Sequence, residues 1–153
     1  MENLGIIGTN SMNGSQFLDT NVLVYAFDTS EPEKRAIAIE LIKTLVESGT
    51  GIISTQVLGE LFNATVIRKK ILDAAEAKLA IKSLTDSFQI VSPSTSEIFS
   101  AISIHKKYQL SYWDSLILAT AKTCGCQQVQ SEDLSDQQDY NGVQVINPFR
   151  QIP

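Results

Sequence analysis

Residues 16–28 read QFLDTNVLVYAFD, a short apolar run that ends at Asp19 and passes at once into a longer apolar segment. Such a short run indicates a buried strand, and the segment after it has the length of a short helix. Asp19 therefore stands where a strand gives way to a helix. An aspartate there also suits the N-cap of the helix, so its position alone leaves a structural and a functional role equally open.

The same alternation continues to the end of the chain. Strands are predicted at 16–18, 51–54, 88–91, 128–130 and 143–146. Helices are predicted at 20–27, 31–48, 54–70, 73–88, 94–108 and 111–125. This pattern predicts one α/β domain over residues 15–150, built on a mostly parallel five-stranded sheet. Residues 1–14 are rich in Gly, Asn and Ser without periodicity and are predicted to form a flexible tail.

The chain of 153 residues is long enough for one compact domain, and its 43% apolar and 19% charged residues are typical of globular proteins. No apolar run reaches the roughly 18 residues that cross a bilayer, and the N-terminus lacks a basic segment followed by a long apolar one. We therefore predict a cytoplasmic protein without a membrane partner. Cys124 and Cys126 are too close in sequence for an unstrained disulfide and are interpreted as packing residues at a helix end.

The net charge of −5 argues against tight nonspecific binding to a phosphate backbone. A divalent cation held by several acids would reverse the sign of the charge locally and give a phosphate group a partner. Basic residues also crowd into one stretch that contains Arg68, Lys69 and Lys70. A basic rim around an acidic centre would reconcile the overall charge with a nucleic-acid substrate.

Three acids besides Asp19 call for an explanation. Glu60 falls on or beside the apolar face of the helix 54–70, where a carboxylate is costly unless it is paired, hydrogen-bonded or bound to metal. Asp114 lies on the apolar face of the helix 111–125, although Ser111 and Asp114 also resemble a capping box. Asp133 follows the fourth strand within QSEDLSD, which also suits a solvated acidic loop.

The functional interpretation of these acids is stronger when the four are considered together. In a parallel α/β sheet the carboxyl ends of the strands and the helices that follow them face one edge, where ligands bind. Carboxylates that converge there would repel one another without a cation. Oxygen ligands without His or Cys suit Mg²⁺ or Mn²⁺, which are commonly paired with phosphate substrates.

Five segments carry a resemblance to a known family: FLDTNVLVYAFD, STQVLGELFN, LSYWDSLILATA, QSEDL and VQVINPF, in this order between Gln16 and Phe149. Together they resemble PIN-domain ribonucleases, and among these the VapC-like toxins of bacterial type II toxin–antitoxin pairs. The resemblance implies a PIN-like three-layer α/β/α fold with strand order 3-2-1-4-5.

The resemblance also implies a metal-dependent endoribonuclease, in which Mg²⁺ or Mn²⁺ activates a water that hydrolyses a phosphodiester bond of single-stranded or loop RNA. The implied catalytic and metal-binding acids are Asp19, Glu60, Asp114 and Asp133. Asn21 and Ser131 are implied as supporting polar groups, and Glu132 leaves open which of two neighbouring acids faces the site. Further implications are a homodimer and a cognate antitoxin that covers the active groove.

Other functions remain open from the sequence. A noncatalytic PIN-like module that binds RNA or protein would keep the fold without the reaction. A haloacid-dehalogenase-like phosphatase would need a second aspartate two residues after Asp19, where the chain has Asn21, and a response-regulator domain would need neighbouring acids after the first strand. Trp113 is interpreted as a core or dimer-contact residue in preference to a base-stacking one, and His105 as a surface residue.

Overall fold

The computed structural model describes residues 14–152 and has one sheet of six strands in the order β3-β2-β1-β4-β6-β5. The strands are β1 (Gln16–Leu18), β2 (Gly51–Ser54), β3 (Gln89–Val91), β4 (Gln128–Gln130), β5 (Asp139–Tyr140) and β6 (Val143–Ile146). All pairings are parallel except that of β5 with β6. The predicted order of the five expected strands is confirmed, since the fifth of them is β6. The predicted tail, apart from Gly14, lies outside the described residues.

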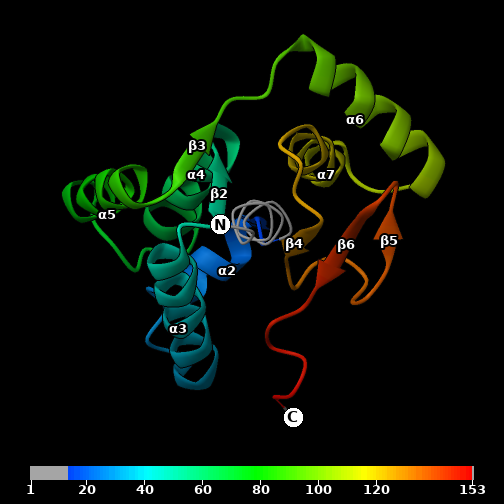
Figure 1. The fold of residues 1–153 in the computed structure, drawn as a ribbon. Coiled ribbons are helices and arrows are strands. Elements are labelled where there is room, and N and C mark those ends of the chain that lie inside the picture. Colours follow the sequence, from blue (N-terminus) through cyan, green and yellow to red (C-terminus); the bar gives the residue numbers. More distant parts are fainter. Residues whose placement is uncertain (1–13, 153) are drawn as a thin grey trace, which may run out of the picture.

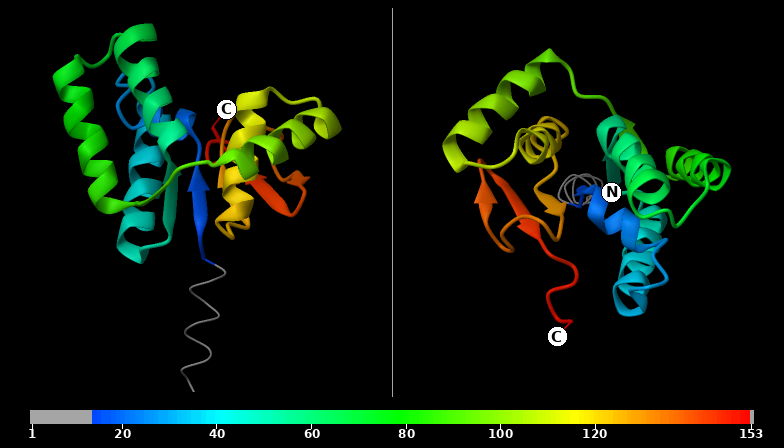
Figure 2. Two further views of the ribbon diagram at one scale, coloured as in Figure 1. Left: turned by 90° about the horizontal axis from the view of Figure 1, so that it is seen from above. Right: turned by 180° about the vertical axis from the view of Figure 1, so that it is seen from behind.

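The helices are α2 (Thr20–Tyr25), α3 (Pro32–Ser48), α4 (Thr55–Phe62), η1 (Asn63–Arg68), α5 (Ala74–Ser87), α6 (Thr95–Tyr108) and α7 (Tyr112–Thr123). In Figure 1, α6 and α7 lie on one side of the sheet and α3 on the other. Helix α2 contacts both α3 and α4, α4 contacts α5, and α6 packs along α7. The two groups of helices are separate in both views of Figure 2, with the sheet between them. This is the three-layer arrangement that the resemblance described above implies.

Strand β5 is an addition to the predicted sheet. It forms a hairpin with β6 through Asn141 and Gly142, whose φ angles are 55° and 93°. Positive φ at both central residues is the requirement of a type I′ turn, which Asn-Gly satisfies well. The Asn-Gly signal was present in the sequence, but a strand of two residues is too short for its apolar alternation to register.

The carboxyl ends of β1 and β4 meet in the middle of the sheet. Leu18 is in register with Gln130, and the backbone N–H of Asp19 donates to the Gln130 carbonyl at 3.0 Å. Residues that follow these strands, Asp19 on one and Ser131 on the other, are therefore neighbours although 112 positions separate them. The register fixes the place at which a site can form.

The helix predicted over 54–70 changes character at Asn63, where α4 gives way to the π-helix η1. The Lys69 N–H donates to the carbonyl of Ala64, five residues earlier, at 2.9 Å. A regular α-helix would bring Ile67 to the face of Glu60 two turns on. The wider turn displaces it, so Ile67 is 56% exposed while Arg68 and Lys69 join Glu60 around one cleft.

Gly51 allows β2 to pass close to the core side chain of Phe88. A Cβ at this position would overlap the ring of Phe88 and lie 3.2 Å from Cβ of Leu45, and both of these residues are buried. We expect Gly51→Ala to lower the free energy of unfolding by about 2 kcal/mol, as overpacked cores do. Urea unfolding measures the change.

Gly59→Ala is the matched control, because nothing lies within 4 Å of the added methyl group. As a helical substitution it should be neutral or stabilising by up to about 1 kcal/mol. Equal stability of the two variants would contradict the described packing of β2 against Phe88.

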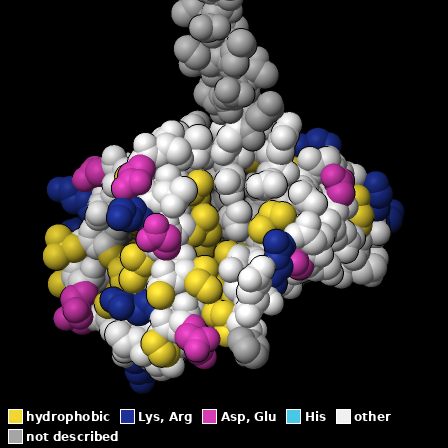
Figure 3. Space-filling model, turned by 60° about the horizontal axis from the view of Figure 1, so that its bottom comes forward, with side chains coloured by type: hydrophobic (Ala, Val, Ile, Leu, Met, Phe, Trp, Pro, Cys, Tyr) yellow, Lys and Arg dark blue, Asp and Glu magenta, His cyan; other side chains and the backbone are white. Residues whose placement is uncertain are grey.

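Among residues 14–152, no helix combines the length and the apolar character needed to cross a membrane. On the face drawn in Figure 3, apolar side chains are interspersed with Lys or Arg and with Asp or Glu. This face therefore offers no continuous basic surface to a nucleic acid.

Candidate active site

A cleft of about 780 Å³ opens where α2, α4, η1, the start of α7 and the segment after β4 approach one another. It brings together all four acids that the sequence singled out, Asp19, Glu60, Asp114 and Asp133. The other residues that line it are Thr20, Asn21, Val24, Tyr25, Thr55, Gln56, Gly59, Asn63, Arg68, Lys69 and Trp113.

Asp19 is the most buried of these acids, with 5% of its surface exposed. It caps α2, and its Oδ1 accepts from the Thr20 N–H at 2.7 Å. Its Oδ2 accepts from the Ser131 hydroxyl at 2.7 Å and from the Asn21 amide at 3.3 Å. Burial raises the pKa of Asp19 to about 7, against the lowering effect of the bonds from Ser131 and Thr20. The structural and the functional interpretation of Asp19 are therefore compatible, because the capping carboxylate lines the cleft.

Asn21 and Ser131 both contact Asp19, as well as each other, at 3.3 Å between Nδ2 and Oγ. Asn21 also accepts the backbone N–H of Glu132 at 3.1 Å through Oδ1. The amide of Asn21 thereby ties the start of α2 to the segment after β4. Both residues are placed to orient the Asp19 carboxylate.

Glu60 is half-buried on α4 and is held by neighbours from two elements. Its Oε1 accepts from the Thr20 hydroxyl at 2.7 Å, and its Oε2 from the Gln56 amide at 3.4 Å. Thr20 bridges Glu60 and Asp19, since its hydroxyl bonds to one and its N–H to the other. The side chain is thus fixed on the wall of the cleft.

Asp114 occupies the first turn of α7, and its N–H donates to the hydroxyl of the N-cap Ser111 at 3.1 Å. Burial raises the pKa of the Asp114 carboxyl, and the negative charges of Asp133 and Glu60 raise it further. Asp114 and Asp133 likewise raise the pKa of Asp19. The carboxylates of the cleft are therefore close enough to repel one another.

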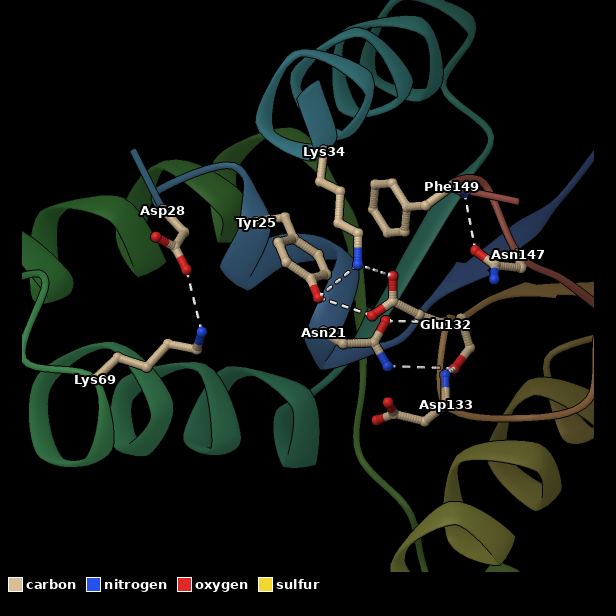
Figure 4. Close-up of polar contacts among 10 residues, drawn as sticks. Asn21, Tyr25, Asp28, Lys34, Lys69, Glu132, Asp133, Asn147 and Phe149 are labelled. Atoms are coloured by element: carbon tan, nitrogen blue, oxygen red, sulfur yellow. Dashed lines mark hydrogen bonds and ion pairs between the residues drawn. The ribbon is translucent and has the colours of Figure 1, made fainter. Parts of the chain in front are cut away.

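The segment after β4 presents Asp133, and not Glu132, to the cleft (Figure 4). Glu132 turns toward α2 and α3, where it accepts from the Tyr25 hydroxyl and from Lys34, each at 2.7 Å. Asp133 is exposed, and its N–H donates to the Ser131 hydroxyl at 3.2 Å. The question that the sequence left open between these two acids is thereby answered.

Lys34 clamps Glu132 through contacts that involve both charge and aromatic rings. Its ammonium group lies 4.7 Å from the ring centroid of Tyr25 and 5.8 Å from that of Phe149. About a quarter of each charged side chain is exposed, 24% for Lys34 and 25% for Glu132.

A double-mutant cycle with Lys34→Ala and Glu132→Gln should give a coupling energy of about 1 kcal/mol in unfolding experiments. Lys43→Ala, on the exposed side of α3, is the control; zero coupling would show that the pair contributes nothing.

The predicted basic rim is present in part. Arg68 and Lys69 line the cleft, whereas Lys70 is not among its lining residues. Lys69 is also bound to the buried Asp28 at 3.1 Å (Figure 4). Hydrogen bonds from Ser30, followed by the contact with Lys69, lower the pKa of Asp28. Part of the charge of Lys69 is therefore balanced within the protein, and Arg68 is the better placed cation.

The donor set of the cleft fits a hard divalent cation, since it consists of carboxylate, amide and hydroxyl oxygens. As the side chains stand, no three His, Cys, Asp or Glu residues of the described part of the chain are grouped closely enough to hold one ion. Binding of one ion by three of these acids therefore requires a rearrangement of their side chains. A cation would also relieve the repulsion that raises the pKa values of Asp19 and Asp114.

Other sequence interpretations have clear outcomes. Trp113 is 60% exposed and lines the cleft, so its interpretation as a core residue is wrong. His105 lies in the last turn of α6 with its ring against the Leu110 carbonyl, outside the cleft. Cys126 is buried in the core and Cys124 ends α7, as expected of packing residues. Burial raises the pKa of Cys126 to about 12, which keeps the thiol protonated.

Several cleft residues were not found from the sequence. Gln56 lies one turn before Glu60 and Asn63 three residues after it. Helical spacing places both on the same face as Glu60, so this spacing could have identified them from the sequence. Thr20 and Tyr25 belong to the stretch around Asp19. Lys34, which does not line the cleft but holds Glu132, had no local signal in the sequence, because Glu132 is 98 positions away.

A family model described as the PIN domain matches residues 17–140, which include all four acids of the cleft. The chain belongs to the PIN domain family. Its sheet order agrees with that assignment. A search of curated proteins gave no match to this PIN-domain sequence.

Solved structures of similar fold include a toxin and toxin–antitoxin complexes. A toxin–antitoxin complex from Klebsiella pneumoniae matches with a TM-score of 0.62 and 21% identity, over 88% of this chain and 98% of that one. The Mycobacterium tuberculosis toxin VapC20, described as cleaving the sarcin–ricin loop, matches with 0.59 and 19%, over 78% and 90%. DNA-bound VapBC from Salmonella typhimurium matches with 0.63 and 15%, over 86% and 96%. Identities this low establish the shared fold alone.

Proposed function

We propose that this PIN-domain protein is a metal-dependent endoribonuclease and the toxin of a toxin–antitoxin pair. The observation that carries the proposal is the convergence of Asp19, Glu60, Asp114 and Asp133 on one cleft. They come from three helices and a loop, and their mutual repulsion calls for a cation. A structural role explains one capping aspartate, but it does not explain why all four face the same space.

Asp19, Asp114 and Asp133 would hold Mg²⁺ or Mn²⁺, with Asn21 and Ser131 keeping Asp19 in place. When bound, the metal polarises the scissile phosphodiester and lowers the pKa of an attacking water. The water oxygen forms a bond to phosphorus as the bond to the 3′-oxygen breaks, which leaves 5′-phosphate and 3′-hydroxyl ends. Glu60, fixed by Thr20 and Gln56, supports the metal as a ligand or accepts the proton that the water releases.

The charge of the cleft suits the proposed partners. Arg68, at the edge of the acids, provides a contact for the phosphate backbone. A cognate antitoxin that inserts an Arg or Lys among the carboxylates would meet the same electrostatic need as the metal and so inhibit the enzyme. The toxin–antitoxin complexes among the structures of similar fold support this partner. We also propose that the protein acts as a homodimer, as the resemblance to VapC-like toxins implies.

The direct test is cleavage of a mixed pool of structured cellular RNAs by the purified protein with Mg²⁺, with Mn²⁺ and with a chelator. We expect discrete products with 5′-phosphate ends that appear only when metal is present. Cleavage that continues in chelator would contradict the metal-dependent mechanism. A folded, antitoxin-free protein that binds RNA without cutting it would favour a noncatalytic binding module.

A further inference from the structure

Trp113 is the only tryptophan of the chain and stands at the cleft, directly before Asp114 in the first turn of α7. Its side chain is 60% exposed, although burial of so large an aromatic group would be favourable. The residue is nevertheless held in place. Its ring packs edge-on against Tyr112 with centroids 5.0 Å apart, and its carbonyl accepts from the Gln56 amide at 3.2 Å. An indole that is exposed, packs against a neighbouring ring and stands beside a carboxylate offers a contact surface to a ligand.

Gln56 adds a second sign of a ligand at this place. Its amide nitrogen faces two acceptors, Glu60 and the Trp113 carbonyl, which fixes the orientation of the amide group. Its Oε1 is then a buried acceptor without a donor among the described residues. Buried polar groups normally have partners, so this acceptor is left unsatisfied beside Trp113. Because the atom is buried, a base amino group or a ribose hydroxyl in the cleft would donate to it only after a movement of the Gln56 side chain.

We propose that the Trp113 indole stacks on an unpaired nucleobase next to the phosphodiester that lies among the cleft acids. The inference rests on the proposed ribonuclease function and names the structural class of its substrate. A base in a duplex has both faces covered by its neighbours, whereas a base in a single strand or loop offers a free face to an aromatic side chain. Since Trp113 adjoins Asp114, the stacked nucleotide adjoins the site of cleavage.

The charge around Trp113 argues against a contact with a second copy of this chain. A symmetric contact would place the Asp114, Glu60 and Asp133 carboxylates of two copies opposite one another, where like charges repel. Exposed apolar side chains that would suit such a contact lie instead on α6, at Ile98, Phe99 and Ile102. RNA differs from a second copy because its phosphates can be met by Arg68 and a metal ion while its base meets the indole.

Fluorescence of Trp113 provides a test that does not depend on cleavage. The Asp19→Asn protein is titrated with a single-stranded RNA oligonucleotide, with the same sequence as a duplex, and with an abasic oligonucleotide of equal length. We expect the single strand to quench the emission and the other two to leave it nearly unchanged. Equal quenching by the abasic chain would overturn the proposal, as would emission that depends on protein concentration and not on RNA.

The second measurement uses cleavage by the Trp113→Ala, Trp113→Phe and Leu79→Ala proteins. Loss of one base stack should raise KM about 5- to 100-fold in Trp113→Ala with a smaller change in kcat, and Trp113→Phe should retain most of the effect. Leu79 is 70% exposed on α5, outside the cleft, so Leu79→Ala should match the wild type. Circular dichroism and thermal unfolding confirm that each variant is folded.

The two proposals fail in different ways. A wild-type protein that cleaves RNA, with Trp113→Ala cleaving at the same KM, would overturn base stacking and leave the ribonuclease intact. Quenching by single-stranded RNA without cleavage by any metal-loaded protein would support the stacking contact and overturn the ribonuclease.

Discussion

Replacement of Asp19 with Asn should lower the rate of RNA cleavage about a hundredfold or more while the protein remains folded. Partners that merely orient a metal ligand contribute about 10- to 100-fold to activity or metal affinity, and Asp19 is proposed to be a ligand itself. The Asn side chain keeps the oxygen that caps α2 but places an NH₂ group where Oδ2 accepts from Ser131 and Asn21. Initial cleavage rates at saturating Mg²⁺ measure the loss.

The same substitution should increase stability above neutral pH. A pKa raised from 3.8 to about 7 corresponds to roughly 4 kcal/mol spent on holding the ionised Asp19 in the fold. Unfavourable contacts of the new amide should cost about 1–3 kcal/mol. Asp19→Asn is therefore expected to be more stable than the metal-free wild type at pH 8 by about 2 kcal/mol.

Asp86→Asn is the matched control, because it makes the same change from carboxylate to amide at an exposed position on α5. It should alter neither cleavage nor stability. Cleavage by Asp19→Asn at the wild-type rate would exclude Asp19 from the site. An inactive Asp19→Asn protein that is also unfolded would point to its cap of α2 as the more important role.

The metal-free protein should lose stability as the pH rises from about 4 to about 7. In this range the folded state keeps the Asp19 proton that the unfolded state has already released, so the folded state binds more protons and is weakened by each increase in pH. The raised pKa of Asp114 acts in the same direction. The loss attributable to Asp19 approaches about 4 kcal/mol, and Asp19→Asn should remove it.

Urea unfolding at pH 5 and pH 8 in chelator measures this difference, and added Mn²⁺ should restore stability at pH 8 because it favours the ionised carboxylates. Asp28 and Glu97 have lowered pKa values, owing chiefly to hydrogen bonds from Ser30 and Ser94 respectively, so their contributions are lost only as the pH falls into the acid range. Equal stability of the metal-free wild type at both pH values would contradict the burial of Asp19.

The sequence was sufficient to predict the strands and helices that carry the four acids of the cleft. Parallel strands order their carboxyl ends along one edge, so an aspartate after β1 and another acid after β4 had to approach each other once the strand order was known. The helical acids followed from spacing, because Glu60 and Asp114 share faces with apolar residues. What the resemblance supplied was the strand order 3-2-1-4-5 and the expectation that the acids act together.

The features that escaped prediction depend on contacts across the fold or on small changes of backbone geometry. The π-helix at Asn63 alters the helical phase by so little that apolar periodicity does not register it, yet it decides that Arg68 and not Ile67 reaches the cleft. Lys34 holds Glu132, which is 98 positions away in the sequence, outside the cleft, so that Asp133 is the acid that lines it. Trp113 is exposed because it lies at the cleft, and the local sequence around Trp113 does not predict this.

The most direct test of the metal site is calorimetric titration of Mn²⁺ into the wild-type, Asp19→Asn and Asp86→Asn proteins at pH 8. Wild type and Asp86→Asn should bind with the same affinity, and Asp19→Asn at least about tenfold more weakly. Absence of Mn²⁺ binding by the folded wild-type protein, or equal affinity in all three proteins, would contradict the assignment of the cleft acids as a metal centre.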